Sequence, residues 1–343
     1  MKRYNNLFSK ICDIENIRLA HHNARKGKTT YGEVKYVDRH EEECLLAIKK
    51  MLESGEYKTS EYTVFVRKFY DKERTIYKLP YYPDRIVHHC IVQVLSPIWE
   101  KTFIRNTFSS IKNRGIHDAV KRIKKDIKNE SNVYCLKLDI KKFYPSVDHD
   151  ILKTILRKKI KDTKVLQLLD SIIDSAEGVP IGNYLSQFFG NLYLTYFDHY
   201  VKEQLQCKFY YRYCDDIVIL HSDKDFLHRV FAKIKLRLNR NLNLIIKKNY
   251  QIFPLAKRGI DFLGYVFYKH CTYIRKEMKQ RYKKKIALVL HRHKFMKDVD
   301  VVSGVMSYFG WFKYANAYHL WRSYTDSYLQ NILFDHGCTK LVV

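Results

Sequence analysis

The chain has 343 residues and carries 63 Lys and Arg against 36 Asp and Glu, which gives a formal net charge of +27. An excess of this size is too large for an ordinary metabolic enzyme and indicates a polyanionic partner. Hydrophobic residues make up 46% of the chain and aromatic residues 15%, enough for a folded core, so a disordered basic tail is excluded.

Hydropathy and cysteine spacing exclude two further classes of protein. No apolar run approaches the roughly 18 residues of a membrane span, and no signal-like apolar stretch follows Met1. The 8 cysteines include no Cys-x-x-Cys pair, so we expect reduced core residues and no zinc site. The adjacent His88 and His89 could bind a metal, but core histidines are the favoured interpretation. We expect a cytoplasmic protein without a membrane partner.

Helices, strands and one early hairpin are predicted from periodicity and residue type. Helical spacing of apolar residues covers residues 41–52, 88–103, 117–129, 151–176, about 185–205, 226–239 and the chain after about 275. Strands are expected at residues 63–79 (a hairpin), 133–140, 209–213, 217–221 and 261–268 (a strand or a hairpin). Two helices laid over an antiparallel sheet, with helical additions at both ends, define an α+β fold.

Asp215 and Asp216 stand side by side between two apolar β-rich runs, and a basic chain needs a reason for such a pair. Like charges repel, but a turn can direct both carboxylates to one point, where a divalent cation relieves the repulsion. A hydrogen-bonded turn, in which Asp is common, is the alternative. Asp139 ends another predicted strand, and strands that deliver Asp to one sheet edge form the oxygen-rich site that Mg²⁺ prefers. Two such ions support nucleotidyl transfer or phosphodiester hydrolysis, and these residues alone leave synthesis and cleavage open.

One basic stretch is denser than the rest of the chain. Residues 275–297 contain ten Lys and Arg and a single acidic residue. Arg275, Lys279 and Lys283 recur at helical i, i+4 spacing on one face, and Tyr282 could stack on bases. We expect this stretch to track a nucleic-acid strand.

Several of these segments together resemble the reverse transcriptase family. Tyr213-Cys-Asp-Asp216 looks like its polymerase signature, and Leu136-Lys-Leu-Asp-Ile-Lys-Lys-Phe-Tyr-Pro-Ser146 looks like its first palm motif. The other matching segments stand in the family's order, resembling group II intron and related bacterial enzymes: residues 82–89, 106–119, 178–187, 258–265 and 307–318. The resemblance spans roughly residues 15–335, and its collinearity makes it specific.

The resemblance implies a right-hand polymerase fold with fingers, palm and thumb. An antiparallel palm sheet would be backed by helices, and the thumb would be helical. Residues 1–132 would form an N-terminal region and the fingers, and residues 133–270 the palm, with a helical insertion at about 150–178. Residues 271–343 would form the thumb.

The second palm motif indicates which subfamily of reverse transcriptases the chain resembles. Most reverse transcriptases have Gln-Gly followed by Ser-Pro there, whereas this chain has Ile181-Gly182 and Ser186-Gln187. That form resembles the reverse transcriptases of diversity-generating retroelements. Some phage-defence enzymes share parts of the pattern, so a defence-associated or group II intron-like reverse transcriptase is the alternative.

The family pattern also implies roles for the charged residues of the palm. Asp139 and Asp215 would hold two Mg²⁺ ions, the Ile140 carbonyl would be a further ligand, and Asp216 would lie nearby as a catalytic and metal-binding residue. Lys248 occupies the position of a lysine suspected of protonating the departing pyrophosphate.

Six residues are implied in binding the deoxynucleoside triphosphate: Arg74, Arg85, Tyr144, Ile181, Gly182 and Gln187. Tyr144 would lie beneath the sugar and exclude a ribose 2′-hydroxyl, while its neighbour Phe143 packs in the core. One or both arginines would grip the triphosphate. A glutamine at position 181 could form a hydrogen bond near the nascent base pair, whereas the Ile181 side chain has no polar group. We therefore expect misincorporation opposite template adenines.

The remaining implied contacts are with the template and primer. A loop of the fingers would touch the template, a hairpin would form the primer grip, and the thumb would follow the template–primer minor groove. The residues are Lys112, Arg114, Phe262, Leu263, Gly264, Arg275, Lys279 and Lys283.

We therefore predict an RNA-directed DNA polymerase, bacterial or phage-encoded, that copies a template RNA into cDNA by two-Mg²⁺ nucleotidyl transfer. The subfamily implies errors at template adenines, as part of a diversity-generating retroelement, and a small basic accessory protein as partner. Two alternatives lie outside the class. A metal-dependent nuclease leaves Tyr144 and the thumb unexplained, and a non-catalytic RNA-binding scaffold has no use for three aspartates.

Overall fold

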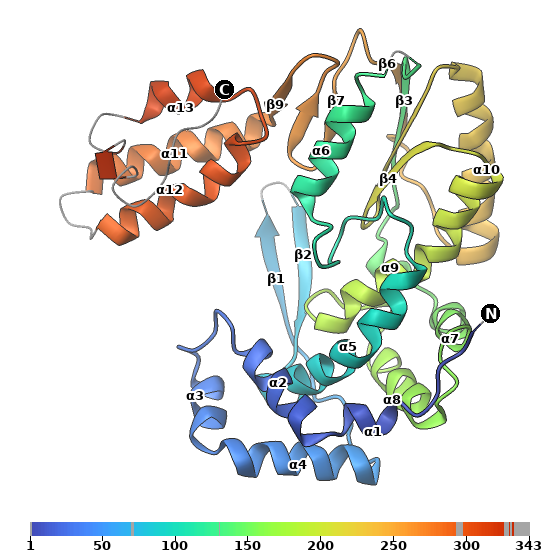
Figure 1. Cartoon of the computed structure of the whole chain (residues 1–343), viewed down its shortest axis with the longest axis vertical. Coiled ribbons are helices and arrows are strands. Elements are labelled where there is room, and N and C mark those ends of the chain that lie inside the picture. Colours follow the sequence, from blue (N-terminus) through green and yellow to red (C-terminus); the bar gives the residue numbers. More distant parts are fainter. Residues whose placement is uncertain are drawn as a thin grey trace. The chain divides into compact units, whose positions relative to one another are not determined.

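The computed structural model describes residues 2–69, 72–129, 131–292, 298–325, 329, 331 and 332 (Figure 1). The α-helices are α1 (Phe8–Ile11), α2 (Ile14–Ala24), α3 (Gly32–Arg39), α4 (Glu41–Ser54), α5 (Ile86–Trp99), α6 (Ile116–Asp126), α7 (His149–Arg157), α8 (Thr163–Ile173), α9 (Tyr184–His199), α10 (Lys224–Leu242), α11 (Lys276–Arg292), α12 (Asp298–Phe312) and α13 (Tyr318–Tyr324). The strands are β1 (Thr63–Phe69), β2 (Lys72–Lys78), β3 (Tyr134–Asp139), β4 (Phe209–Tyr213), β5 (Asp216–His221), β6 (Gln251–Pro254), β7 (Ile260–Phe262), β8 (Tyr265–Phe267) and β9 (Thr272–Ile274). The predicted α+β class is confirmed.

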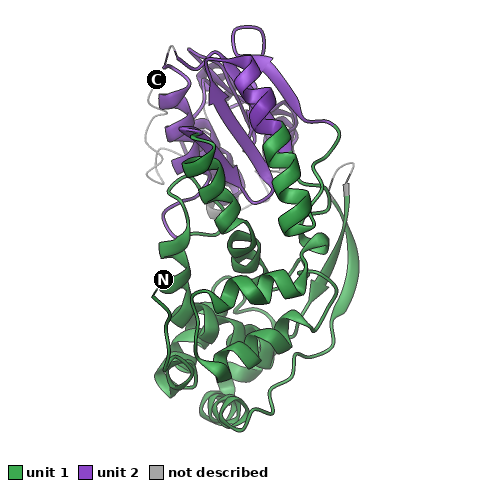
Figure 2. Cartoon of the chain, turned by 90° about the vertical axis from the view of Figure 1, so that its right-hand side faces the viewer, with its two compact units in different colours: residues 1–111, 139–206, 232–248 green, residues 112–138, 207–231, 249–343 purple. Residues whose placement is uncertain are grey.

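The chain forms two compact units that interleave along the sequence (Figure 2). The first unit comprises residues 1–111, 139–206 and 232–248. The second unit comprises residues 112–138, 207–231 and 249–343. The sequential division into fingers, palm and thumb at residues 132 and 270 stays a prediction.

Helix α5 is the centre of the first unit. It is apolar on almost every side, as expected of a helix surrounded by protein, and it packs against α2 and α9. His88 and His89 are buried within it, which confirms them as core histidines. Burial, together with the charge of Arg85, lowers the pKa of His88 to about 3, so this imidazole is neutral.

The helical segment predicted over residues 151–176 is confirmed, but it is interrupted and consists of two helices, α7 and α8. The N-terminal segment causes the break. Tyr4 forms a parallel bridge with Ile160, and the Asp162 carboxylate accepts a hydrogen bond from the Leu7 amide at 2.7 Å while it caps α8. Since these partners are far apart in sequence, local periodicity carries no sign of them.

The second unit contains a four-stranded sheet in the order β4-β5-β3-β6. Strands β4 and β5 are antiparallel neighbours, and β3 pairs antiparallel with β6. The amide of Val133, just before β3, donates to the carbonyl of His221, the last residue of β5, at 3.2 Å. The start of β3 therefore lies beside the end of β5. Helix α6 is fixed to β4 by a hydrogen bond from the Tyr211 hydroxyl to Asp126.

The C-terminal part of the second unit is a three-stranded sheet, β7-β8-β9, followed by helices. Helices α11 and α12 pack on each other through an aromatic cluster around Tyr282, which is 0% exposed. Its ring contacts those of Tyr308, Phe312, Trp321 and Tyr324. The prediction that Tyr282 stacks on bases is wrong, because its ring is buried in this cluster and is not exposed on the basic face of α11. Residues 293–297 of the basic stretch lie outside the described residues.

Two predictions from the sequence can be compared with the structure: the absence of a membrane span and the reduced state of the cysteines. Over the part of the chain that the structure describes, every helix is too short or too polar to cross a bilayer. The described cysteines, residues 12, 44, 90, 135, 207, 214 and 271, are free thiols, and five of them are buried. This agrees with the prediction of reduced core residues.

Candidate active site

A tight turn between β4 and β5 carries the aspartate pair. Tyr213 lies opposite Asp216 in the register, so the turn consists of Cys214 and Asp215, and Cys214 has a φ of +52°. The fully buried guanidinium of Arg212 donates from Nη1 to the Cys214 carbonyl at 2.9 Å. This bond holds the turn in place. The role of Arg212 was not predicted from the sequence, although a charged residue inside a run of strand aromatics was a signal for it.

Asp139 is the last residue of β3, and its backbone continues the pairing. The Asp139 carbonyl accepts a hydrogen bond from the Lys247 amide at 2.8 Å, and Ile140 forms an antiparallel bridge with Ile246. Hydrogen bonds of the flanking residues close this bridge on both sides, so the amide and carbonyl of Ile140 point away from Ile246. The Ile140 carbonyl is therefore not used in this pairing, and its role as a metal ligand stays a prediction.

The lysine that contacts Asp139 is Lys247, the residue before the predicted proton donor Lys248. Lys247 Nζ lies 2.7 Å from Asp139 Oδ1, whereas Lys248 is exposed in the following turn. The family pattern pointed to Lys248 because spacing alone cannot say which of two adjacent lysines faces the strand. The role of Lys248 as a proton donor stays a prediction, and Lys247 is the lysine that neutralises Asp139.

The oxygen atoms of Asp139, Ile140 and the aspartate pair can be compared with the ligands that a divalent cation prefers. Carboxylate oxygens and a main-chain carbonyl are the ligands that Mg²⁺ prefers, and Asp139 already accommodates a cation, the Lys247 ammonium. Within the described residues, no group of three or more His, Cys, Asp or Glu side chains is assembled closely enough to hold a metal ion. Asp139 belongs to the first unit and the Asp215–Asp216 pair to the second. The shared metal site therefore stays a prediction.

The loop of residues 178–182, between α8 and α9, lies against the turn that carries Tyr144. The Val179 amide donates to the Tyr144 carbonyl at 2.9 Å. Gly178 has a φ of +59°, and a Cβ on it would lie 2.6 Å from the Pro145 carbonyl oxygen. Only glycine fits this position, and the loop is therefore fixed at its first residue to the backbone of the Tyr144 turn.

The other end of the 178–182 loop is fixed to the β1–β2 hairpin. The Tyr77 amide of β2 donates to the Ile181 carbonyl at 2.8 Å. Gly182 has a φ of +130°, and a Cβ there would overlap the Tyr77 carbonyl oxygen. The structure thus links the Tyr144 turn to Ile181 and Gly182 through backbone hydrogen bonds of the 178–182 loop. All three are predicted nucleotide-binding residues of the first unit.

The rings of Phe143 and Tyr144 lie against α9. A Cβ on Gly190 of α9 would be 3.2 Å from an atom of each ring, so this glycine allows the close approach. Phe143 is 3% exposed and is a core residue as predicted, whereas Tyr144 is partly exposed. Tyr144 is therefore not fully buried, and its contact with a sugar stays a prediction.

Gln187 contacts a loop of the predicted fingers. Its Oε1 accepts a hydrogen bond from the Ser110 hydroxyl at 2.7 Å, and one turn further along α9 the Asn191 side chain donates to the Ser109 carbonyl at 2.7 Å. Ser110 has a φ of +55°, so this turn needs such support. The contact gives Gln187 a structural role that the sequence did not reveal, and its contact with a nucleotide stays a prediction.

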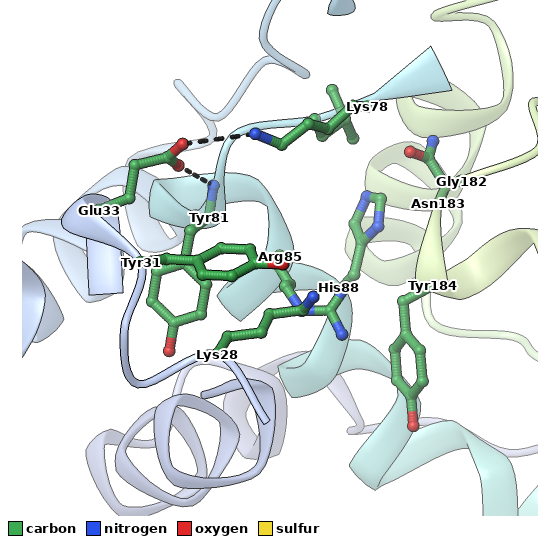
Figure 3. Close-up of a pocket in the computed structure, with 11 residues that line it drawn as sticks. Lys28, Tyr31, Glu33, Lys78, Tyr81, Arg85, His88, Gly182, Asn183 and Tyr184 are labelled. Atoms are coloured by element: carbon green, nitrogen blue, oxygen red, sulfur yellow. Dashed lines mark hydrogen bonds and ion pairs between the residues drawn. The ribbon is translucent and has the colours of Figure 1, made fainter. Parts of the chain in front are cut away.

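A cavity of about 250 Å³ lies in the first unit (Figure 3). Its wall combines three cations with aromatic rings, and it includes two predicted nucleotide-binding residues, Arg85 and Gly182. The lining residues are Lys28, Tyr31, Glu33, Lys78, Leu79, Tyr81, Arg85, His88, Gly182, Asn183 and Tyr184. Burial lowers the pKa of the Arg85 guanidinium, which donates from Nε to the Ala24 carbonyl at 3.3 Å. Arg74 is exposed on β2 and is not part of this wall.

The predicted primer grip is the β7–β8 hairpin. Phe262 is 0% and Leu263 9% exposed, so both side chains belong to the core. The turn has positive φ at Leu263 and Gly264, and a Cβ on Gly264 would lie 2.7 Å from the Trp311 ring. A primer contact by Phe262, Leu263 or Gly264 would therefore involve their backbone.

The other residues predicted to contact the template and primer differ in whether their side chains are exposed or contact other residues of the protein. Arg275 forms a hydrogen bond from Nε to Asp261 Oδ1 at 2.6 Å and so ties the start of α11 to the hairpin. Lys283 lies over the Tyr324 ring at 4.6 Å from its centroid. Lys279 is exposed on α11, and Lys112 is exposed in the loop before α6, where Arg114 is partly buried. Their contacts with nucleic acid stay predictions.

The sheet, its acidic turn and the sequence motifs can now be placed in a family. A family model described as Reverse transcriptase (RNA-dependent DNA polymerase) matches residues 66–267, more than half of the chain. The chain therefore belongs to the reverse transcriptase family.

Individual relatives agree with this assignment. Protein YkfC of Escherichia coli (strain K12) is 24% identical over 248 residues, covering 59% of this chain and 65% of its own. The group II intron-encoded protein LtrA of Lactococcus lactis subsp. cremoris is 27% identical over 203 residues, covering 54% of this chain and 33% of its own. The chain thus spans less than two thirds of either relative.

A solved structure shows the fold. Telomerase from Candida albicans, solved in complex with a TWJ fragment of telomeric RNA, matches with a TM-score of 0.51 and 12% sequence identity. The match covers 82% of this chain and 60% of the telomerase chain. The fold is accordingly the right-hand polymerase fold that the sequence predicted.

Proposed function

We propose that the chain is an RNA-directed DNA polymerase that copies a template RNA into cDNA from deoxynucleoside triphosphates. The observation that carries this proposal is the position of the aspartates in a reverse transcriptase sheet. Asp139 ends β3, Asp215 lies in the turn between β4 and β5, and Asp216 begins β5. The net charge of +27 suits a template and primer as polyanionic partners.

In this proposal Asp139 and Asp215 hold the divalent metal ions, with the Ile140 carbonyl and Asp216 beside them. The sheet order supports this, since antiparallel strands bring the end of one and the start of its neighbour to the same edge. Bound Mg²⁺ would supply charge stabilisation for the attacking and leaving oxygens. Arg212 keeps the aspartate turn in shape, and Lys247 balances the charge of Asp139.

The nucleotide would be bound largely by the first unit, whereas the predicted template and primer residues belong to the second unit. Tyr144 would face the sugar and Ile181 the base, and Arg74 or Arg85 would bind phosphate. The cavity beside Arg85 joins cations to aromatic rings, which suits the phosphate and base of a nucleotide. Gln187, Lys248 and the predicted template and primer residues belong to the same proposal, as do the fingers, palm and thumb at residues 1–132, 133–270 and 271–343.

Primer extension on an RNA template tests the proposal. With Mg²⁺ and deoxynucleotides, the wild-type chain is expected to make cDNA, and a chelator is expected to stop it. The Asp215→Ala variant, purified in parallel, controls for contaminating polymerases and is expected to be inactive. A wild-type chain that extends no primer with Mg²⁺ or Mn²⁺, or an Asp215→Ala variant of equal activity, would instead favour a non-catalytic RNA-binding scaffold.

At the subfamily level we propose an enzyme of a diversity-generating retroelement, error-prone at template adenines. Ile181-Gly182 followed by Ser186-Gln187 supports this choice over a phage-defence or group II intron-like enzyme. The same resemblance supports a small basic accessory protein as partner and a cytoplasmic location in a bacterium. Sequencing of cDNA made by the purified enzyme tests it, because errors concentrated opposite adenine are expected.

Replacing Ile181 by glutamine is expected to reduce misincorporation opposite template adenine about fivefold, because one added hydrogen bond is worth about 1 kcal/mol. The Ile181 backbone is held by Tyr77, so the substitution changes the side chain alone. Ile181→Leu, which adds no polar group, is the matched control and should keep the wild-type error rate. Equal adenine errors in wild type and Ile181→Gln would remove Ile181 as the cause of infidelity.

A further inference from the structure

His149, the first residue of α7, binds the 178–182 loop with its ring. Its Nε2 lies 2.8 Å from the Gly178 carbonyl oxygen, and its Nδ1 lies 3.2 Å from Asp174 Oδ1. A carbonyl oxygen only accepts hydrogen bonds, so Nε2 must carry the hydrogen. None of the roles assigned above uses this histidine, although it contacts the segment on which Tyr144 and Ile181 are brought together.

The other anchors of the loop show what His149 adds. The Val179 amide donates to the Tyr144 carbonyl, the Ser186 hydroxyl of α9 donates to the Pro180 carbonyl at 2.7 Å, and the Tyr77 amide donates to the Ile181 carbonyl. Each of these bonds fixes a later residue of the loop. His149 fixes the Gly178 carbonyl, at the point where the backbone lies against the Tyr144 turn.

The ring is itself held in orientation. Lys153, one helical turn further along α7, places Nζ 2.6 Å and 2.7 Å from the two carboxylate oxygens of Asp174, which caps the end of α8. Burial raises the pKa of the Asp174 carboxyl, but Lys153 and His149 outweigh it and hold this pKa below its ordinary value. The carboxylate therefore stays ionised and accepts a hydrogen bond from Nδ1, so both ring nitrogens donate and Nε2 is directed at the loop.

We propose that His149 is a positioning residue for nucleotide selection. By holding Gly178 against the Tyr144 turn, it fixes the separation between the ring that meets the sugar and the Ile181 side chain that meets the base. This inference rests on the proposed polymerase function. It predicts that loss of the Nε2 bond loosens discrimination between substrates more than it slows extension with the correct deoxynucleotide.

Two substitutions separate the two ring nitrogens. A glutamine at position 149 places its amide nitrogen near the position of Nε2, and an asparagine places its amide nitrogen near that of Nδ1. His149→Asn is expected to change the ratio of deoxynucleotide to ribonucleotide incorporation, and the rate of misincorporation, by about fivefold, as for one lost hydrogen bond. His149→Gln is expected to keep the wild-type ratios. Equal melting temperatures of the two variants would show that neither is misfolded.

Hydrogen exchange of residues 178–182 provides a readout that needs no polymerase activity. His149→Asn is expected to exchange these amides about fivefold faster than wild type, and His149→Gln at the wild-type rate. The inference is overturned if the two variants match each other in selectivity and in exchange. If the wild-type chain fails to polymerise, the proposed function and the role in selection both fall, and the exchange data alone decide whether His149 holds the loop.

Discussion

Replacing Asp139 by asparagine is expected to lower RNA-templated primer extension at least about a thousandfold, which corresponds to about 4 kcal/mol of activation free energy. Asparagine keeps the shape and one oxygen of the side chain but removes the negative charge that a divalent cation requires. Because Asp139 ends β3, where the backbone is fixed by pairing with residues 246 and 247, the rest of the site should stay in place.

Two controls separate this charge effect from instability. Asp139 also pairs with Lys247, but partly exposed ion pairs contribute only about 0–1 kcal/mol, so the melting temperature should change little. Asp223→Asn removes a carboxylate charge just beyond the other end of β5 and keeps an oxygen for the Asp225 amide, so activity near wild type is expected. A similar loss in both asparagine variants would show that net charge, and not the Asp139 position, is responsible.

Replacing Gly182 by alanine is expected to have the second-largest effect. The new methyl group would overlap the Tyr77 carbonyl oxygen, a backbone atom that cannot rotate away, and the φ of +130° is unfavourable for alanine. We expect a loss of at least about 2 kcal/mol of stability and a detached 178–182 loop. Denaturation and primer extension should both report the change, with extension reduced at least about tenfold.

Gly55 provides the matched control for this substitution. It caps α4 in the same unit with a φ of +76°, and a Cβ there would meet no atom within 4 Å. Gly55→Ala should therefore cost only the backbone strain, about 1 kcal/mol, and leave primer extension unchanged. Equal losses of activity in the two variants would show that the contact between the loop and β2 is unimportant.

The local elements could be predicted because their signals lie within a few residues. The β1–β2 hairpin and the pair β4 and β5 were expected from runs of strand-forming residues, and α4 was expected from its apolar spacing. The break between α7 and α8 could not be predicted, since the contacts at it, Tyr4 with Ile160 and Leu7 with Asp162, form only in the folded chain. The four-residue β6 was missed because such a short strand is defined by its partner β3 and not by its own sequence.

The candidate site divides in a similar way. The motifs identified Asp139, Asp215 and Tyr144 from residue type and order, but not the residues that hold them. Arg212 acts through its buried bond to the turn, and Lys247 forms an ion pair with Asp139, and neither contact follows from spacing along the chain. The roles of aromatic residues were equally difficult to predict. Tyr282 lies in a basic segment, as a base-stacking residue would, but its side chain is buried in the core.

The central claim is that Asp139 and Asp215 share metal ions. Anomalous diffraction from crystals of the enzyme with primer, RNA template, Mn²⁺ and a non-hydrolysable deoxynucleotide tests it most directly. We expect Mn²⁺ peaks at coordination distance from carboxylate oxygens of both aspartates, with the Ile140 carbonyl among the ligands. Manganese bound by one aspartate without the other, or no manganese near either, would contradict the account.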